Sequence, residues 1–487
     1  MDFPYLTAII FLPVVGAILI AFMPNLSDRL IRRMAAIFTL IPLALSIILF
    51  LGFDKSAGAA GVIQFEEKLS WIPTINAYYH LGVDGLSLPL VILMAFLGFM
   101  VVLISWKISL RLREYFAWLL LLETSILGVF ISLDLLLFFV FWEIEVIPMY
   151  FLISIWGTGR KEYSAMKYVI FTLFGSAMML AGILSLYFAT GSLSMVEMRG
   201  LDIPIVGIFL LLFIGFAIKL PVFPLHTWLP DAHTDAPTAV SVVLAGALLK
   251  MGGYGMIRVC VGIFPQVALH YAPILVAFAV VTVLYGAAVT LRQTDLKRMI
   301  AYSSISHMGY VLLGVFALTQ VSLTGAALQM LSHGVITGLL FAVAGLVMHN
   351  SGERNLNKLG GLARQMPIIA VVFSIAGLGA LGLPTTSGFA AEFLVFLGSF
   401  TSTIVAGIQV YTILAVLGIV VTAGYILWML QRVFYGPVLE QFNGVADADV
   451  MEKVYMVTFI AVIMLVGIYP AILTDVIKLG VLPMVGG

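Results

Sequence analysis

Long apolar runs separated by short polar stretches extend along the whole chain. Each run is about as long as the roughly 20 residues that an α-helix needs to cross the hydrocarbon layer of a bilayer. The charged and Pro/Gly-rich stretches between them divide the sequence into predicted spans. About fourteen are expected, near residues 5–24, 30–52, 82–106, 115–133, 134–156, 165–190, 204–226, 237–262, 271–291, 298–318, 322–348, 367–400, 408–432 and 453–479. The predicted fold class is an all-α polytopic membrane protein.

The composition agrees with this pattern and excludes several classes of function. Of 487 residues, 62% are hydrophobic and 10% are charged, whereas soluble domains carry roughly 25% charged residues. A formal net charge of zero predicts no nucleic-acid partner. Cys260 is the single cysteine, so an internal disulfide and a cysteine-ligated iron–sulfur cluster are excluded. Neither a Walker loop nor a dinucleotide-binding glycine motif occurs, and we expect no cofactor in this chain.

The basic residues predict how the spans are oriented. With the N-terminus outside, the odd-numbered loops hold seventeen Lys and Arg residues, and the opposite loops and the C-terminus hold only Lys55, Lys68, Arg199 and Lys478. Such an asymmetry follows the positive-inside rule, so both termini should face outward. Arg258 lies near an outer helix end, and no loop accounts for Lys219 and Lys250. These two lysines are therefore predicted to lie inside the membrane.

Two spans carry helix-breaking residues, which predicts a pair of repeats. Pro221 and Pro224 follow Lys219 in the seventh span, and Pro384 precedes Glu392 in the twelfth. Proline removes a helical hydrogen bond, so both spans should be broken helices. Spans four to eight and nine to thirteen then form two inverted five-helix repeats, an arrangement typical of transporters. The predicted units are residues 1–114, 115–263, 264–436 and 437–487.

Several ionisable residues are predicted at membrane depth. A charge at the bilayer centre costs at least about 2.5 kcal/mol, so each needs a reason. Ion pairs that only hold helices together are one reading. The other is a proton path, because acids and lysines that face each other at low dielectric change each other's proton affinity. The candidates are Glu143, Lys219, Lys250, His307, His333 and Glu392, with His226 and Glu123 as weaker members.

Glu143 and Glu145 lie two residues apart in the apolar run LFFVFWEIEVIPMYF. At about 100° per residue, two helical positions differ by about 200°, so the two carboxylates cannot line one path. One should face the bundle axis, and the other a neighbouring helix or subunit. Further on, HTWLPDAHTDAP contains two histidines and two aspartates. Its prolines prevent a regular helix in which both histidines would lie on one face as metal ligands. A rigid connector is therefore expected there rather than a metal site.

Five segments together resemble one known family. They are GVDGLSLPL (82–90), FFVFWEIEVIPMYFLISIWG (138–157), FAIKLPVFPLHTWLPDAHTDAPTAVSVVLAGALLKMGGYGMIR (216–258), DLKRMIAYSSISHMGY (295–310) and LPTTSGFAAEF (383–393). They are similar to the antiporter-like membrane subunits of respiratory complex I, and the resemblance covers nearly the whole chain. The length and Glu392, where other branches of the family typically carry lysine, favour one branch of it.

The resemblance implies a role for each candidate residue. Glu143 and Lys219 match the family's glutamate–lysine pair, which leaves Glu145 pointing away from Lys219. Lys250 matches the central lysine, His307 and His333 match the relay of the second half, and Glu392 matches the terminal acid. The E-x-E pattern is more familiar from photosynthetic-type complexes, which leaves the electron donor open between NADH and ferredoxin.

The resemblance also implies partners and a location. Neighbouring membrane-arm subunits and the lipid bilayer are the expected partners. Quinone, flavin, iron–sulfur clusters and NADH are expected on those partner subunits, and the membrane is expected to be the bacterial inner membrane. The alternatives are a subunit of a Mrp-type cation/proton antiporter, a membrane-bound hydrogenase subunit, or a structural scaffold.

Overall fold

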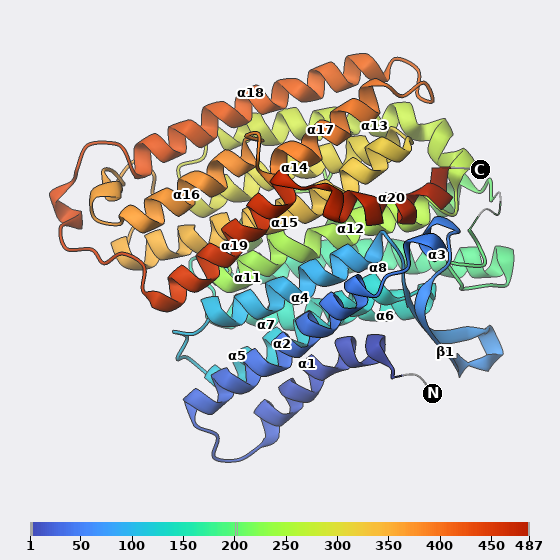
Figure 1. Cartoon of the computed structure of the whole chain (residues 1–487), viewed down its shortest axis with the longest axis horizontal. Helices are drawn as coiled ribbons and strands as arrows, with labels where there is room; N and C mark the ends of the chain where they lie inside the picture. Colours follow the sequence, from blue (N-terminus) through green and yellow to red (C-terminus); the bar gives the residue numbers. More distant parts are fainter. Residues whose placement is uncertain (1–2, 200, 202, 486–487) are drawn as a thin grey trace.

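The computed structural model describes residues 3–199, 201 and 203–485 of the chain. Its helices run side by side in one bundle, with α1 and α2 at one edge and α18 at the opposite edge (Figure 1). Within the described residues, twelve helices are long and apolar enough to cross a membrane. The chain is therefore a mostly helical, multi-pass membrane protein, as its hydropathy pattern predicts.

The helices have the following bounds: α1 (Tyr5–Phe22), α2 (Asp28–Leu51), α3 (Lys55–Ala59), α4 (Ser87–Ile104), α5 (Leu112–Ile131), α6 (Leu135–Ile144), α7 (Val146–Trp156), α8 (Lys161–Thr190), α9 (Val206–Lys219), α10 (Trp228–Asp235), α11 (Thr238–Val243), α12 (Leu249–Gly255), α13 (Pro265–Thr290), α14 (Leu296–Phe316), α15 (Gln320–Ser351), α16 (Pro367–Ala380), α17 (Ser387–Phe400), α18 (Ile408–Val433), α19 (Val450–Ile468) and α20 (Ala471–Val485). Two π-helical segments, η2 (Leu244–Leu248) and η3 (Met256–Val261), join α11 and α12 into one continuous span and end it.

Polar side chains begin several of these helices. Asp134 accepts hydrogen bonds from the backbone N–H groups of the first turn of α6, and Asp295 does the same for α14. Thr319 and Asp449 each form a reciprocal capping box, at α15 and α19 respectively. Such caps satisfy the N–H groups that a helix leaves free at its start. These four helices therefore begin where a short polar residue follows a loop.

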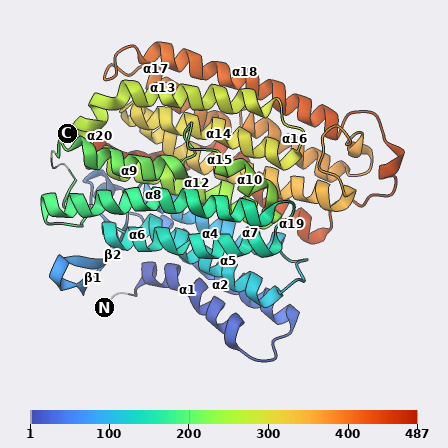
Figure 2. The ribbon, with the colours of Figure 1, turned by 180° about the vertical axis from the view of Figure 1, so that it is seen from behind.

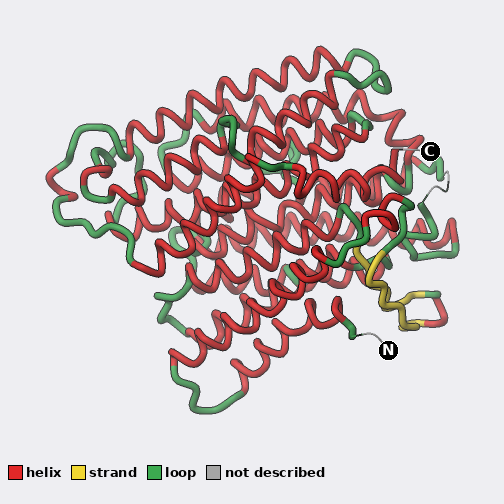
Figure 3. Tube along the Cα trace, in the orientation of Figure 1, coloured by secondary structure: helices red, strands yellow, loops and turns green. Residues whose placement is uncertain are grey.

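A β-hairpin departs from the predicted all-α fold. Strands β1 (Gln64–Ile72) and β2 (Ala77–Val83) pair antiparallel and lie at the same end of the bundle as the two chain termini (Figure 3). Glu67 fixes the hairpin to α1, because its carboxylate accepts hydrogen bonds from the backbone N–H of Leu6 at 2.8 Å and of Thr7. These hydrogen bonds join residues about sixty positions apart in the chain. The local sequence pattern therefore could not predict them.

The two predicted helix breaks are present, and two further interruptions occur. Residues 220–227 separate α9 from α10, and residues 381–386 separate α16 from α17. The predicted span at 134–156 is interrupted at Glu145, where α6 gives way to α7. The predicted last span, 453–479, was wrong in its length: α19 ends at Ile468, Pro470 follows, and α20 begins a new helix at Ala471.

The α11–α12 span and α15 form the centre of the bundle. Every residue is buried in the most apolar stretch of each. They run antiparallel and touch at glycines: a Cβ added at Gly334 would lie 2.6 Å from the carbonyl oxygen of Gly246. On the face shown in Figure 2, α8 passes in front of this centre and packs on α9 and α10. Charged groups on the central helices are consequently far from lipid.

Candidate functional site

The first buried cluster consists of Lys219, Glu145 and Tyr168. Lys219 forms an ion pair with Glu145, and the exposed fractions of the two side chains are 1% and 0%. The Tyr168 hydroxyl donates to the second oxygen of the Glu145 carboxylate and lies 3.3 Å from Lys219 Nζ. The ring of Trp142 completes the cage, with Nζ 5.5 Å from its centre. Three groups from two spans thus compensate the buried ammonium ion of a third span.

The helix break places Lys219. Because Pro221 has no N–H, α9 ends at Lys219, and a carboxyl-terminal helix end favours a positive charge. The break frees the carbonyl of Ile218, which accepts a hydrogen bond from the indole N–H of Trp228 at 3.0 Å. The same residues that interrupt the helix therefore hold the lysine in place.

The predicted pairing of Glu143 with Lys219 was wrong. The two glutamates do point to opposite faces, but Glu145 faces inward to Lys219 and Glu143 faces outward. Glu143 is half-buried in an otherwise apolar groove on the outer surface of α6, α7 and α8, and one of its carboxylate oxygens has no hydrogen-bond partner among the described residues. The rotation of α6 that buries Phe138 and Trp142 against Phe216 fixes this choice.

The second cluster is a row of four side chains from four helices. Lys250 Nζ lies 2.8 Å from His333 Nδ1. The ring centres of His333 and His307 are 5.5 Å apart, and His307 Nδ1 lies 3.3 Å from a carboxylate oxygen of Glu392. All four residues are buried. The predicted central lysine, the two relay histidines and the terminal acid are therefore neighbours in space, in the order Lys250, His333, His307 and Glu392.

The π-helical segment η2 shapes the Lys250 end of this row. The wider turn lets Lys250 Nζ donate to the carbonyl oxygen of Ala245, five residues earlier on the same span. Single π-turns inside membrane helices are frequent at functional sites. Here the turn supplies one fixed acceptor and leaves the rest of the ammonium group directed at His333.

A small polar cavity lies beside the two histidines. It has a volume of about 10 Å³ and is lined by His307, His333, Gln329, Glu392 and neighbouring small residues. Nε2 of both histidines and the amide oxygen of Gln329 have no partner among the described residues. A space of this size holds about one water, which needs two to four polar partners. The cavity can therefore join the two imidazoles through a water.

Glycines at the second helix break bring its backbone close to Glu392. Gly382 has a φ of +77°, and a Cβ there would lie 2.7 Å from a carboxylate oxygen of Glu392. A residue other than glycine would be strained in this conformation and would crowd the acid. At the end of the row, Glu392 therefore lines the small cavity and contacts the loop at residues 381–386.

The two clusters lie on helices that pack directly together. A Cβ added at Gly252 on α12 would lie 2.6 Å from the backbone nitrogen of Leu220, which follows Lys219. Within the described residues, no hydrogen bond joins Lys219 to Lys250. The lysines are therefore on adjoining helix segments but in separate hydrogen-bond networks.

The two weaker candidates are in neither network. Glu123 is 2% exposed on α5, faces Gly98 of α4, and has an oxygen without a partner among the described residues. His226 lies in the break after α9, where its ring packs against Phe223 and Tyr285. Both are buried polar groups, and in the described part of the chain neither forms a hydrogen bond or ion pair with a member of the two clusters.

Sequence reasoning missed two residues of the site. Tyr168 was overlooked because a search for charges passes over a phenol. His233 was assigned to a connector, but it is fully buried in α10, its ring stacks on Phe341 at 4.6 Å, and both its ring nitrogens lack partners among the described residues. The aspartates of the same segment are engaged: Asp231 pairs with Lys167 at 2.6 Å. A buried imidazole with two free nitrogens can accept or donate a proton.

A further ion pair stabilises the outward end of the central span. Arg258 donates to both carboxylate oxygens of Asp84, at 2.6 and 2.8 Å, and Asp84 also caps the start of α4 through Leu86 and Ser87. Burial by itself raises the pKa of the Asp84 carboxyl, but the Arg258 charge and hydrogen bonds outweigh it and bring that pKa to about 2. Asp84 is therefore a permanent anion that ties α4 to the end of η3.

Comparisons with known proteins agree over nearly the full length. Residues 132–418 match the family described as NADH:quinone oxidoreductase/Mrp antiporter, TM. Chain 4 1 of the NAD(P)H-quinone oxidoreductase of Synechococcus sp. (strain JA-3-3Ab) is 40% identical over 98% of this chain and 91% of its own length. Subunit M of the NADH-quinone oxidoreductase of Rhodobacter capsulatus is 38% identical over 97% and 94%. A chain of respiratory complex I from Thermus thermophilus superposes with a TM-score of 0.89, at 28% identity, over 99% of this chain and 100% of that one.

Proposed function

The chain belongs to the NADH:quinone oxidoreductase/Mrp antiporter transmembrane family, and on that premise we propose that its two buried clusters carry protons across the membrane. It is a complex I subunit of the type called subunit M or chain 4. The proposed path contains Lys219 with Glu145, followed by Lys250, His333, His307 and Glu392. Glu143, which faces outward, is left out of this path.

The row from Lys250 to Glu392 is the observation that carries the proposal. A lysine, two imidazoles and a carboxylate follow one another in the buried centre of the bundle. Lys250 Nζ and His333 Nδ1 are 2.8 Å apart, the two ring centres are 5.5 Å apart, and His307 Nδ1 is 3.3 Å from a Glu392 oxygen. Each group can hold or release a proton, and the cost of burying charge couples neighbouring protonation states. A purely structural ion pair needs two partners, and the Nε2 atoms of both histidines have no partner within the described residues, so they serve no such pair.

Lys219 and Glu145 act as a charge switch in this proposal. While the pair is closed, Glu145 compensates the Lys219 ammonium. A charge arriving from a neighbouring subunit that draws Glu145 away would leave the ammonium uncompensated and would drive its proton toward Lys250. The packing of Leu220 on Gly252 supports this transfer, because it places the two helix segments side by side.

As part of the proposal, the whole complex transfers electrons from NADH or a related donor to quinone. This chain is a subunit of that oxidoreductase, and flavin, iron–sulfur clusters, NADH and quinone are proposed to bind its partner subunits. The neighbouring membrane-arm subunits are proposed as direct partners, in a bacterial inner membrane. The names of the relatives favour this reading over a cation/proton antiporter.

The finer architecture also belongs to the proposal. We propose fourteen spans, with residues 115–263 and 264–436 as two inverted five-helix repeats between the units 1–114 and 437–487. The two helix breaks, at residues 220–227 and 381–386, support this division because each lies in the fourth helix of its unit. Metal binding is not proposed, and the roles of His226 and Glu123 stay predictions.

Substitution of Lys250 in the assembled complex tests the function. In Lys250→Met, quinone reduction and proton pumping should both fall by at least about tenfold, since the central proton acceptor is lost. Lys478→Met, at an exposed lysine of α20, is the matched control. Wild-type pumping by an assembled Lys250→Met complex would refute the path, and sodium-driven proton flux without a redox partner would favour the antiporter.

A further inference from the structure

A polar cavity of about 410 Å³ lies where α18 ends at the basic face of the bundle, the face that carries most of the loop lysines and arginines. The last turns of α18 form one wall, and the loop between α15 and α16 forms the other with Leu356, Asn357 and Leu359. α18 runs along one edge of the bundle (Figure 1). Asn357 and Gln431 are exposed, so the cavity opens at the surface. We call it the edge cavity.

The guanidinium group of Arg432 is held in the edge cavity without a counter-ion. Its Cζ lies 4.1 Å from the centre of the Trp428 ring, and one of its nitrogens donates to the side-chain oxygen of Asn357. Within the described residues, Arg432 forms no ion pair with an acid. A guanidinium has five N–H groups, so several remain free for another acceptor. The ring and the amide thus orient the group and leave its charge available to an anion.

The other polar groups of the edge cavity are neutral donors or lie beside further cations. The amides of Asn357 and Gln431 can each donate hydrogen bonds, and no described carboxylate lines the cavity. On the flanking loops, Lys358 and Arg364 are exposed, and Glu440 is the exposed acid. The edge cavity therefore suits an anion with several oxygen acceptors, such as a phosphate group.

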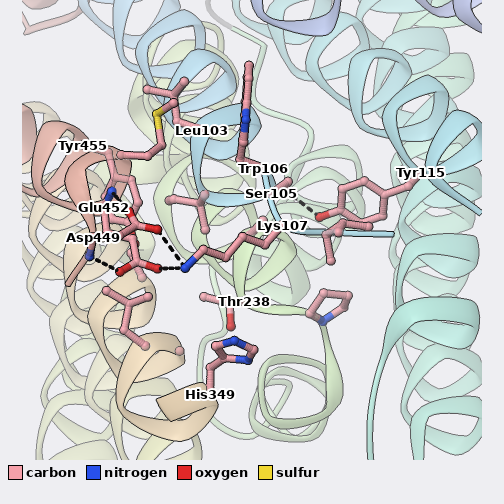
Figure 4. A pocket seen from close by; sticks show the side chains of 18 residues that line it. Leu103, Ser105, Trp106, Lys107, Tyr115, Thr238, His349, Asp449, Glu452 and Tyr455 are labelled. Carbon is pink, nitrogen blue, oxygen red and sulfur yellow. Dashed lines mark hydrogen bonds and ion pairs between the residues drawn. The ribbon is translucent and has the colours of Figure 1, made fainter. Parts of the chain in front are cut away.

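A second cavity on the same face has the opposite balance of charge. It has a volume of about 240 Å³ and lies between the end of α4 and the start of α19. Lys107 there donates to Glu452 at 2.7 Å and pairs with Asp449 at 2.9 Å (Figure 4). Two carboxylates against one ammonium leave an excess negative charge, which repels a phosphate. Of these two cavities, only the edge cavity offers an uncompensated cation.

An exposed apolar stripe on α18 leads from the edge cavity into the membrane. Leu417, Val420 and Leu427 are 50%, 68% and 52% exposed. Together with Gly424 and Gln431 they follow one another at three- and four-residue steps, so they share one face of the helix. Gly424 makes a dent in this face, because a Cβ added there meets no atom within 4 Å. The stripe therefore ends at Gln431, in the wall of the edge cavity.

The length and level of the stripe match one leaflet of a bilayer. From Leu417 to Leu427 the helix rises about 15 Å, at about 1.5 Å per residue, and the hydrocarbon of one leaflet is half of about 30 Å. Trp428 and the 60% exposed Tyr435 lie at the basic end, as expected of aromatic residues at a membrane–water interface. A ligand that follows both stripe and cavity has an apolar chain and an anionic head.

We propose that the edge cavity binds the phosphate of an anionic phospholipid from the leaflet at the basic face. Arg432 and the amides of Asn357 and Gln431 hold the phosphate oxygens, and one acyl chain lies along the α18 stripe over Gly424. The stripe favours a lipid over free phosphate, because free phosphate has no chain to cover it. This inference goes beyond the proposed function and does not depend on the proton path.

Photolabelling of the assembled complex tests the site. The complex is reconstituted in phosphatidylcholine vesicles with a trace of phosphatidylglycerol that carries a diazirine on one acyl chain. After illumination, mass spectrometry should find label on α18 between Leu417 and Leu427. In Arg432→Gln this labelling should fall by at least about fivefold, the factor that one basic residue near a membrane surface contributes. Arg33→Gln, at an exposed arginine of α2 on the same face, is the matched control and should leave it unchanged.

A second variant and two competitors complete the test. Gly424→Trp keeps Arg432 but fills the dent, so it should lower the labelling as well. Wild-type labelling in either variant overturns the inference, since the head or the chain then lies elsewhere. Unlabelled phosphatidylglycerol should compete for the site. Equal competition by added phosphatidylcholine would show that anionic lipid is not selected, and displacement of the label by inorganic phosphate would show a site for free phosphate; both results overturn the inference. None of them bears on pumping by Lys250→Met, which tests the proposed function separately.

Discussion

Lys219 and Glu145 form a fully buried ion pair, while Glu143, two residues earlier, faces the outside of the bundle. A buried pair of this kind is costly to break, because the remaining charge has no solvent to stabilise it. The two neighbouring glutamates therefore have unequal roles, and their substitution distinguishes them.

Glu145→Gln should reduce proton pumping by at least about tenfold, because Lys219 loses its counter-charge and its proton is held less firmly. Glu143→Gln should keep pumping within about twofold of wild type in the assembled complex. Proton uptake by inside-out vesicles and quinone reduction are the measurements, with the amount of assembled complex determined by immunoblot. The reverse order of the two effects would contradict the pairing.

Tyr168→Phe should lower pumping by several-fold without preventing assembly. The substitution keeps the ring that packs on Trp228 and removes the hydroxyl that donates to Glu145. Loss of one hydrogen bond to a charged group costs about 1.5–3 kcal/mol. Tyr163→Phe on the exposed side of the same helix is the control. Equal pumping by the two variants would show that the hydroxyl does not support the pair.

Sequence reasoning predicted a good part of this site, and its errors have identifiable causes. The helical angle correctly separates Glu143 from Glu145, but it cannot say which one faces inward. That depends on how α6 is rotated against Phe216, a contact between residues far apart in the chain. The resemblance to the family predicted Glu143 as the partner of Lys219. Only the tertiary packing shows that the partner is Glu145.

The members of the second cluster followed from sequence, whereas their order, with His333 between Lys250 and His307, comes from the structure. Lys250, His307, His333 and Glu392 were singled out by charge and by resemblance, and all four are neighbours. The β-hairpin was missed because Glu67 anchors it to backbone groups of α1, which leaves no local periodic signal. His233 was missed because the prolines around it were taken as evidence for a connector alone.

His307→Gln should abolish most pumping while leaving assembly intact. Glutamine keeps a polar side chain beside Glu392 but cannot pass a proton between His333 and the carboxylate. We expect a loss of at least about tenfold in pumping. His270→Gln at an exposed position of α13 should have no effect. Retention of pumping in an assembled His307→Gln complex would show that protons bypass this histidine.

Asp84→Asn should destabilise the protein, since it leaves Arg258 buried without its counter-ion. Breaking such a pair costs about 3–5 kcal/mol, so thermal unfolding in detergent should begin at a clearly lower temperature. The control is Asp475→Asn in the exposed pair with Lys478, where about 0–1 kcal/mol is expected. An Asp84→Asn variant as stable as this control would show that Arg258 is compensated in another way.

The same ion pair predicts how stability depends on pH. The pKa of Asp84 is about 2 in the folded protein, against 3.8 for a free side chain. A depressed pKa contributes stability that is fully present above the unfolded value and is lost as pH falls through the folded value. The contribution is about 2.5 kcal/mol, because the two pKa values differ by almost two and each unit corresponds to about 1.4 kcal/mol. The measurement is the unfolding temperature of the wild type and of Asp84→Asn from pH 7 to pH 3. The difference between the two proteins is the contribution of Asp84. It should be constant down to about pH 5 and decline only below about pH 4. A decline that begins near neutral pH would mean that Asp84 is not held as an anion by Arg258.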